Sequence, residues 1–283
     1  LAETLAGRIG IVNMHPFSVN ETEKNKISTL KCFKRHALSG SYPELITGRN
    51  VDTGLWYNNY INTYIEKDVK SLFEIGNAAD FSLFIKILAL RTSQMLNMSS
   101  VASEVKVSVP TIKKWISILE TSGIIFLLHP YHRNLKKRLV KTPKLYFYDT
   151  ATACRMCAIY DEKSLFGSPL LGAMFENFIA AEAAKHIHSR GLNTTLSYIR
   201  TNSGLEIDLA AEAGGKYSLF EIKASKSVRP GSADNMNEAE KNILPAGSIM
   251  SKTIITMNDS EGVAGGGSYY SGISGLFEKL KNI

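Results

Sequence analysis

Acidic residues and a lysine alternate with apolar residues in two neighbouring stretches of the chain. The first stretch, residues 204–211, contains Asp208, and the second contains Glu221 and Lys223. A period of two is typical of β-strands, and Gly214-Gly215 between the stretches predicts a hairpin turn. Alternate residues of a strand share one face. We therefore expect Asp208, Glu221 and Lys223 to converge on one spot of a paired sheet.

This constellation suits phosphodiester chemistry. Carboxylate oxygens of Asp208 and Glu221 are the ligands that Mg²⁺ prefers, and an adjacent Lys223 can position the water that attacks phosphorus. Two plainer alternatives stand beside this hypothesis. Lys223 could be a surface lysine paired with Glu221, and Arg200 on the preceding predicted strand could either hold a phosphate or pair with Glu206. We favour the Arg200–Glu206 pair.

A predicted helix upstream supplies a fourth candidate. Residues 170–185 are apolar at helical spacing and contain Glu176. The order helix-Glu, Asp, then Glu-x-Lys resembles the PD-(D/E)xK, or restriction-endonuclease-like, phosphodiesterase core, matched here by Glu176, Asp208 and Glu221-Ile222-Lys223. The resemblance implies that Asp208 and Glu221 bind Mg²⁺, that Glu176 completes or tunes the metal shell, and that Lys223 positions the attacking water.

The middle of the chain predicts a bundle of helices followed by two strands. Helices are predicted at residues 54–73, 80–91, 99–106 and 108–123, and short strands at 124–128 and 144–148. Ser108 is placed to cap the last helix, Pro110 falls in its first turn, and serines are placed to cap the short helix before it. Helix, short helix, capped helix and β-ribbon predict a winged helix-turn-helix.

Basic residues gather where this winged helix would meet DNA. No acidic residue occurs between Gly123 and Phe147. A basic wing beside a helix with exposed lysines fits contact with DNA phosphates, although winged helices also join proteins. The candidate DNA-binding residues are Lys113, Lys114, Arg133, Lys136, Lys137 and Arg138.

Composition narrows the class of protein. The 283 residues are 44% hydrophobic and carry a formal charge of +7, which allows two packed domains and is compatible with a polyanionic partner. No apolar run approaches the ~18 residues of a membrane span, so we expect a cytoplasmic protein. Cys154 and Cys157 lack the further ligands of a zinc site, and we expect both to be small core residues.

The chain also resembles the part of a prokaryotic AAA+-like ATPase family that follows the ATPase module. The matching segments are L-A-G-R with H-P-F-S near the N-terminus, and P-K-L-Y-F-Y-D-T at residues 143–150. The resemblance implies a winged helix and a PD-(D/E)xK-like domain after an ATPase. The sequence has no G-x-x-x-x-G-K-[ST] phosphate loop, so we expect ATP to bind only in a full-length protein.

Together these features predict an α/β (α+β) protein with three parts. Residues 1–50 would be a remnant of the ATPase module, 51–160 a helical domain with a winged helix, and 161–283 a restriction-endonuclease-like domain. We expect residues 149–160 to be a linker, 233–241 a helix, 248–257 a strand and 262–268 a flexible turn.

Two functions from different classes fit this organisation. One is Mg²⁺-dependent hydrolysis of DNA phosphodiesters at the site described above. The other is a non-catalytic module that uses the same surfaces to engage DNA, the ATPase module or another protein, and so positions or regulates the ATPase.

Overall fold

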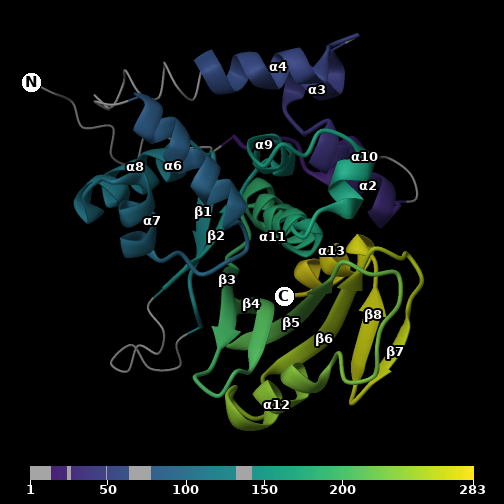
Figure 1. The fold of residues 1–283 in the computed structure, drawn as a ribbon. Helices are drawn as coiled ribbons and strands as arrows, with labels where there is room; N and C mark the ends of the chain where they lie inside the picture. Colours follow the sequence, from purple (N-terminus) through teal and green to yellow (C-terminus); the bar gives the residue numbers. More distant parts are fainter. Residues whose placement is uncertain (1–13, 24–26, 49, 64–77, 132–141) are drawn as a thin grey trace, which may run out of the picture.

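The computed structural model describes residues 14–23, 27–48, 50–63, 78–131 and 142–283. The chain is a mixed α/β protein in which a helical part lies beside a six-stranded mixed sheet (Figure 1). The long helix α11 (Leu171–Arg190) runs between these two parts. One continuous hydrophobic cluster includes side chains from the helical part, from α11 and from the sheet.

The sheet has the strand order β3-β4-β5-β6-β8-β7. Strands β3, β4 and β5 form an antiparallel meander, β6 is parallel to both β5 and β8, and β7 pairs antiparallel with β8. The strands are β3 (Thr195–Arg200), β4 (Glu206–Ala213), β5 (Lys216–Lys223), β6 (Ile249–Thr256), β7 (Gly262–Gly265) and β8 (Ser268–Ser271). The β4–β5 hairpin that the alternating pattern predicted is confirmed.

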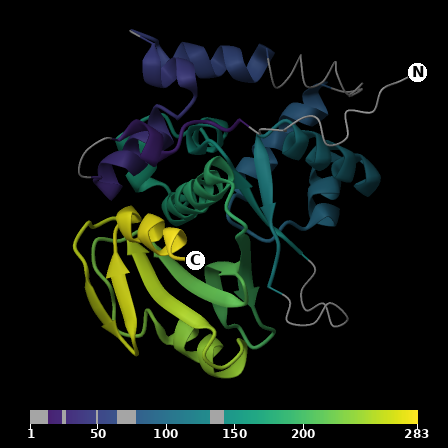
Figure 2. The same cartoon turned by 180° about the vertical axis from the view of Figure 1, so that it is seen from behind.

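Helices cover both faces of this sheet, as Figure 2 shows from behind. Helices α11 and α13 (Ile273–Lys281) contact strands β5 and β6 with one apolar cluster, and α12 (Asp234–Asn242) packs on β4 and β5 with a second. The parallel pair β5–β6 is joined through α12, which matches the predicted helix at 233–241 and the predicted strand at 248–257. The glycine-rich stretch at 262–268, predicted as a turn, instead contributes the edge strand β7 before it turns.

The helical part contains the helices and the ribbon predicted for the middle of the chain. Its elements are α4 (Thr53–Tyr60), α6 (Ala78–Leu90), α7 (Met98–Val105), α8 (Val109–Thr121), β1 (Ile125–Leu128) and β2 (Lys144–Phe147). Ser108 caps α8 as predicted, but α7 is capped by Asn97, because the helix begins one residue before the first predicted serine. The C-terminal part of the helix predicted at 54–73 lies outside the described residues.

Three further short helices contact α11: α2 (Thr29–Leu38), α9 (Thr150–Met156) and α10 (Glu162–Gly167). The short helix α1 (Val19–Thr22) precedes α2 in the chain, and α3 (Pro43–Thr47) lies beside α4 in Figure 1. Helix α9 corrects the prediction of a linker at 149–160. It is buried against α2, α6 and α11, and it includes Cys154 as a free, buried thiol, as expected of a core residue.

Asp149 holds this corner of the helical part together. Its buried carboxylate accepts hydrogen bonds from the backbone N–H and hydroxyl of Ser41, from the Tyr57 hydroxyl at 2.7 Å, and from the N–H and hydroxyl of Thr152. These donors come from three separate segments of the chain. Asp149 therefore both caps α9 and fixes its position against the N-terminal segments.

We predict that Asp149→Ala lowers the free energy of unfolding by about 3 kcal/mol or more, because it leaves several buried donors without an acceptor. Urea denaturation followed by circular dichroism measures the change. The matched control is Asp161→Ala, which removes an exposed aspartate that caps α10 in the same way. Equal losses for the two variants would contradict the role given to Asp149.

Candidate functional site

The structure gathers the four sequence-predicted site residues at one end of the β4–β5 pair. Lys223 Nζ lies 2.5 Å from Glu221 Oε1, and burial, followed by the nearby charge of Asp208, raises the pKa of Glu221. Glu176 reaches the same cluster from α11, since its Oε1 and Asp208 Oδ1 lie 3.1 and 3.8 Å from the same ammonium nitrogen, that of Lys144. The alternation on both strands and the helical pattern upstream predicted that these residues lie together.

A break in the strand ladder sets the direction of Asp208. The β3–β4 pairing passes from Ser197↔Ala210 to Ile199↔Ile207, so that β4 has one residue more than β3 over this interval. Such a bulge twists the strand and re-aims a side chain. The ordered β4–β5 pairing stops at Leu209, and Asp208 Oδ2 accepts the N–H of Ile222 at 2.8 Å.

Lys144 is a member of this cluster that the sequence did not single out. Its side chain is 3% exposed, and its Nζ lies 2.8 Å from Glu206 Oε1, 3.1 Å from Glu176 Oε1 and 3.8 Å from Asp208 Oδ1. Burial alone would lower the pKa of this amine, but the three carboxylates outweigh it and hold the pKa above its usual value. Lys144 is therefore a buried, charged ammonium inside the acidic cluster.

Strand β2 brings Lys144 into the cluster because a buried amide fixes it to α11. Asn177 Oδ1 accepts the N–H of Phe147 at 2.7 Å, and Asn177 Nδ2 donates to the carbonyl of the same residue at 3.1 Å. Tyr146, two residues from Lys144, donates its hydroxyl to Glu176 Oε1 at 2.7 Å. The strand thus presents both polar side chains to Glu176.

Burial and mutual repulsion shift the acids of the cluster toward neutrality. Desolvation first, and then the charge of Asp208, raise the pKa of Glu176 to about 7 and that of Glu221 to about 7. Desolvation also raises the pKa of Asp208, against the opposing effect of Lys144. Arg200 pairs with Glu206 at 2.7 Å, which confirms the favoured alternative for that arginine.

One carboxylate oxygen of the cluster has no partner. Glu221 Oε2 is buried and accepts no hydrogen bond from the described residues, whereas Oε1 of the same side chain is held by Lys223. A buried oxygen of this kind costs free energy unless a ligand satisfies it. In the described part of the chain, no group of three or more His, Cys, Asp or Glu side chains is arranged to hold a metal ion.

The predicted DNA-contacting residues divide into two sets. Lys113 and Lys114 lie on α8 with exposed side chains. The other four, Arg133, Lys136, Lys137 and Arg138, lie outside the described residues.

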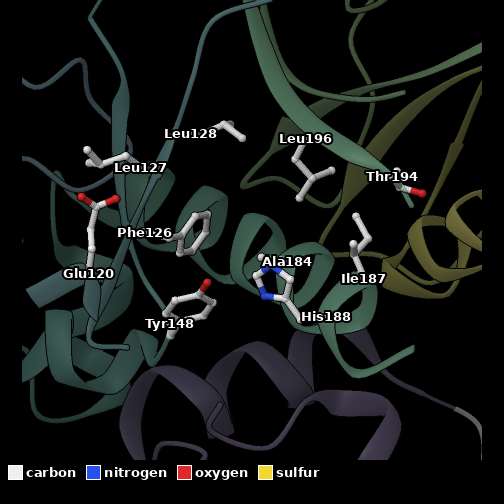
Figure 3. Close-up of a pocket in the computed structure, with 10 residues that line it drawn as sticks. All are labelled: Glu120, Phe126, Leu127, Leu128, Tyr148, Ala184, Ile187, His188, Thr194 and Leu196. Carbon is white, nitrogen blue, oxygen red and sulfur yellow. The ribbon is translucent and has the colours of Figure 1, made fainter. Parts of the chain in front are cut away.

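A separate pocket opens between β1, α11 and β3, beside Tyr148 (Figure 3). Its volume is about 290 Å³, and its lining combines apolar side chains with Glu120, Tyr148 and His188. Burial lowers the pKa of His188 and raises that of Glu120, so both groups favour their neutral forms there. None of the four predicted catalytic residues lines this pocket.

Comparison with known proteins finds two family models along the chain. Residues 30–163 match a domain of unknown function, DUF8612, and residues 171–263 match another, DUF4143. The second is a domain found in ATPase-associated, AAA-like proteins. The first match ends within α10, and the second begins at the first residue of α11.

Two curated relatives are uncharacterized proteins of Mycobacterium bovis and Mycobacterium tuberculosis. Each is 29% identical to this chain over 227 residues, which cover 80% of the chain and 49% of the relative. The chain thus spans about half the length of the curated relatives it matches. The described helices include none with the length and apolar character needed to cross a membrane.

The raised pKa values predict carboxyl groups that titrate near neutral pH. As the pH rises through about 7, Glu176 and Glu221 should lose their protons, so infrared difference spectra of the metal-free chain should show carboxylic acid converting to carboxylate. Glu221→Gln should reduce this signal, and Glu278→Gln, at an exposed position, should leave it unchanged. A chain without carboxyl titration near neutrality would contradict the assignment.

Proposed function

We propose that the chain carries a divalent-cation-dependent site that hydrolyses DNA phosphodiesters, within a PD-(D/E)xK-like domain. The observation that carries the proposal is the buried, unpartnered Glu221 Oε2, which stands beside Asp208 and Lys223. A hard cation such as Mg²⁺ would satisfy this oxygen. The order of β3, β4, β5 and β6, with α11 supplying Glu176, supports the same family of folds.

The donor set fits Mg²⁺ because that ion keeps several waters and is commonly bound through one or two carboxylates plus substrate phosphate oxygens. Asp208 and Glu221 would hold it, and Glu176 would complete or tune its shell. When bound, the cation would polarise the scissile phosphate and favour the ionised form of an attacking water.

The chain's own residues would do the remaining work. Lys223 is 43% exposed, so its ammonium can reach both the attacking water and the charge that develops on the phosphate oxygens. In the hydrolysis, the water gives up a proton to solvent as its oxygen bonds to phosphorus, one phosphorus–oxygen ester bond breaks, and the leaving oxygen takes up a proton from solvent. The hydrogen bond from Ile222 N–H to Asp208 Oδ2 would keep the Asp208 carboxylate oriented toward the cation.

DNA would reach this site from the helical part. Helices α6, α7 and α8 followed by the β1–β2 ribbon have the order and the short second helix of a winged helix-turn-helix. The exposed Lys113 and Lys114 on α8 would contact phosphates, and the basic segment around Arg133, Lys136, Lys137 and Arg138 would extend this contact.

A second candidate function is favoured by Lys144. Its ammonium compensates the charges of Glu176, Glu206 and Asp208. An ion-pair cluster with a purely structural role would have the same arrangement. The domain would then be a non-catalytic module that engages DNA, an ATPase module or another protein. The cleavage experiment below separates the two functions.

We predict that the purified chain cleaves plasmid, linear, single-stranded or branched DNA with Mg²⁺ or Mn²⁺, and that Asp208→Asn lowers the rate by about a hundredfold or more. Asparagine can still accept the Ile222 N–H, so the fold is preserved while a ligand charge is lost. Lys223→Gln should lose turnover but keep cation binding.

The matched control is Glu212→Gln. Glu212 lies at the far end of β4, the strand that carries Asp208, and its replacement should leave cleavage unchanged. Cleavage that survives Asp208→Asn would show that another nuclease is responsible. No cleavage of any of these substrates would favour the interaction module.

We further predict that the chain binds duplex DNA without sequence preference. Replacing Lys113 and Lys114 together by alanine should weaken binding and reduce the slope of log affinity against log salt by about one unit per lysine. Fluorescence anisotropy over a series of salt concentrations measures both effects. The control replaces two other exposed lysines, Lys31 and Lys163, and should change neither. Equal effects of the two double variants would refute contact through α8.

A further inference from the structure

Asp208 stands between two different surroundings. Its Oδ1 faces the Lys144 ammonium at 3.8 Å, in a group that also contains Glu176 and Glu206. Its Oδ2 accepts the Ile222 N–H, on the strand that carries Glu221 with its unpartnered oxygen. The acidic cluster therefore has two halves that share Asp208. A lysine fills the first half, and the second contains the buried oxygen that lacks a partner.

A carboxylate shared between two halves is the arrangement of sites that hold two cations about 3.5–4 Å apart. Here the first half contains three carboxylates around one point, which would attract a cation strongly if Lys144 were absent. The ammonium lies within 3.8 Å of all three. Its nitrogen thus occupies the point that the three carboxylates surround.

Lys144 also lowers the negative charge of the cluster. Four carboxylates, Glu176, Glu206, Asp208 and Glu221, meet three cationic side chains, Lys144, Lys223 and Arg200, which leaves one negative charge when all are ionised (four minus three). Removing Lys144 would leave two negative charges in the cluster. A carboxylate cluster buried to this degree requires compensation by cations.

Lys144 differs from Lys223 in its access to substrate. The Lys144 side chain is 3% exposed and lies in contact with the acids, whereas the Lys223 side chain is 43% exposed. Lys144 also comes from β2 in the helical part, not from the strands that carry the other site residues. It cannot contact a phosphate without leaving its carboxylates, so its role is to position and neutralise them.

We propose that Lys144 replaces the second metal ion of this site, so that the chain binds a single divalent cation, between Asp208 and Glu221. Lys144 is then a positioning residue that keeps Glu176, Glu206 and Asp208 in place and closes their half of the cluster to metal. This inference rests on the proposed function, because it assumes that the cluster binds a cation at all.

The test counts Mn²⁺ ions bound by the full chain, by calorimetry and by electron paramagnetic resonance. The wild-type chain should bind one isolated ion. Lys144→Gln, which keeps a polar side chain but removes the charge, should bind two ions, with the resonance signature of a magnetically coupled pair. Lys252→Gln is the matched control, because Lys252 is also buried and paired with an acid, Glu240, outside the cluster. It should still bind one ion.

Several outcomes separate this inference from the proposed function. Two ions in the wild-type chain, or one ion in a folded Lys144→Gln chain, would overturn the role of Lys144 and leave the cation-dependent site standing. The wild-type count alone can refute the role if the variant fails to fold. No ion in the wild-type chain, or one ion that persists in Asp208→Asn, would overturn the proposed cation site itself.

Discussion

The ion pairs of Lys144 are the interaction on which the arrangement of this molecule depends. Four acids gathered in a largely buried place would repel one another and lose hydration, and an ammonium at 2.8–3.8 Å from three of them offsets both costs. The lysine belongs to β2, while its partners belong to α11 and β4. The same contacts that make the acidic cluster possible therefore also join the helical part to the sheet.

Neighbouring contacts support this junction. Asn177 holds the backbone of β2 against α11, and the Tyr146 hydroxyl shares Glu176 with Lys144. Asp149, just beyond β2, fixes the following helix to the N-terminal segments. A movement of the helical part would change the distance between Lys144 and its acids, and with it the charge available to a cation.

Local patterns in the sequence predicted the elements that carry the candidate site. The two-residue alternation gave the β4–β5 hairpin, and the helical spacing around Glu176 gave α11. Long-range contacts were not predictable in this way. Lys144 is one of many basic residues between Gly123 and Phe147, and nothing in its neighbours indicates that it pairs with Glu206, 62 residues later in the chain.

Two other differences between the prediction from the sequence and the structure also arise from long-range contacts. The bulge that turns Asp208 arises from the pairing of β4 with β3, which a single strand does not reveal. Residues 150–156 form a buried helix instead of a linker, because Asp149 finds its partners Ser41 and Tyr57 about a hundred residues away in the chain. The sequence therefore specified which residues could do chemistry, while tertiary contacts determined their charge and direction.

We propose that Asp208 and Glu221 hold a divalent cation beside Lys223. Crystals of the chain soaked in Mn²⁺ test it most directly through the anomalous difference density at the manganese absorption edge. We expect one peak, within coordination distance of Asp208 and Glu221 Oε2, with Lys144 still in contact with Glu176 and Glu206. A map with no peak at these carboxylates, from crystals that bind Mn²⁺ elsewhere, would contradict the claim.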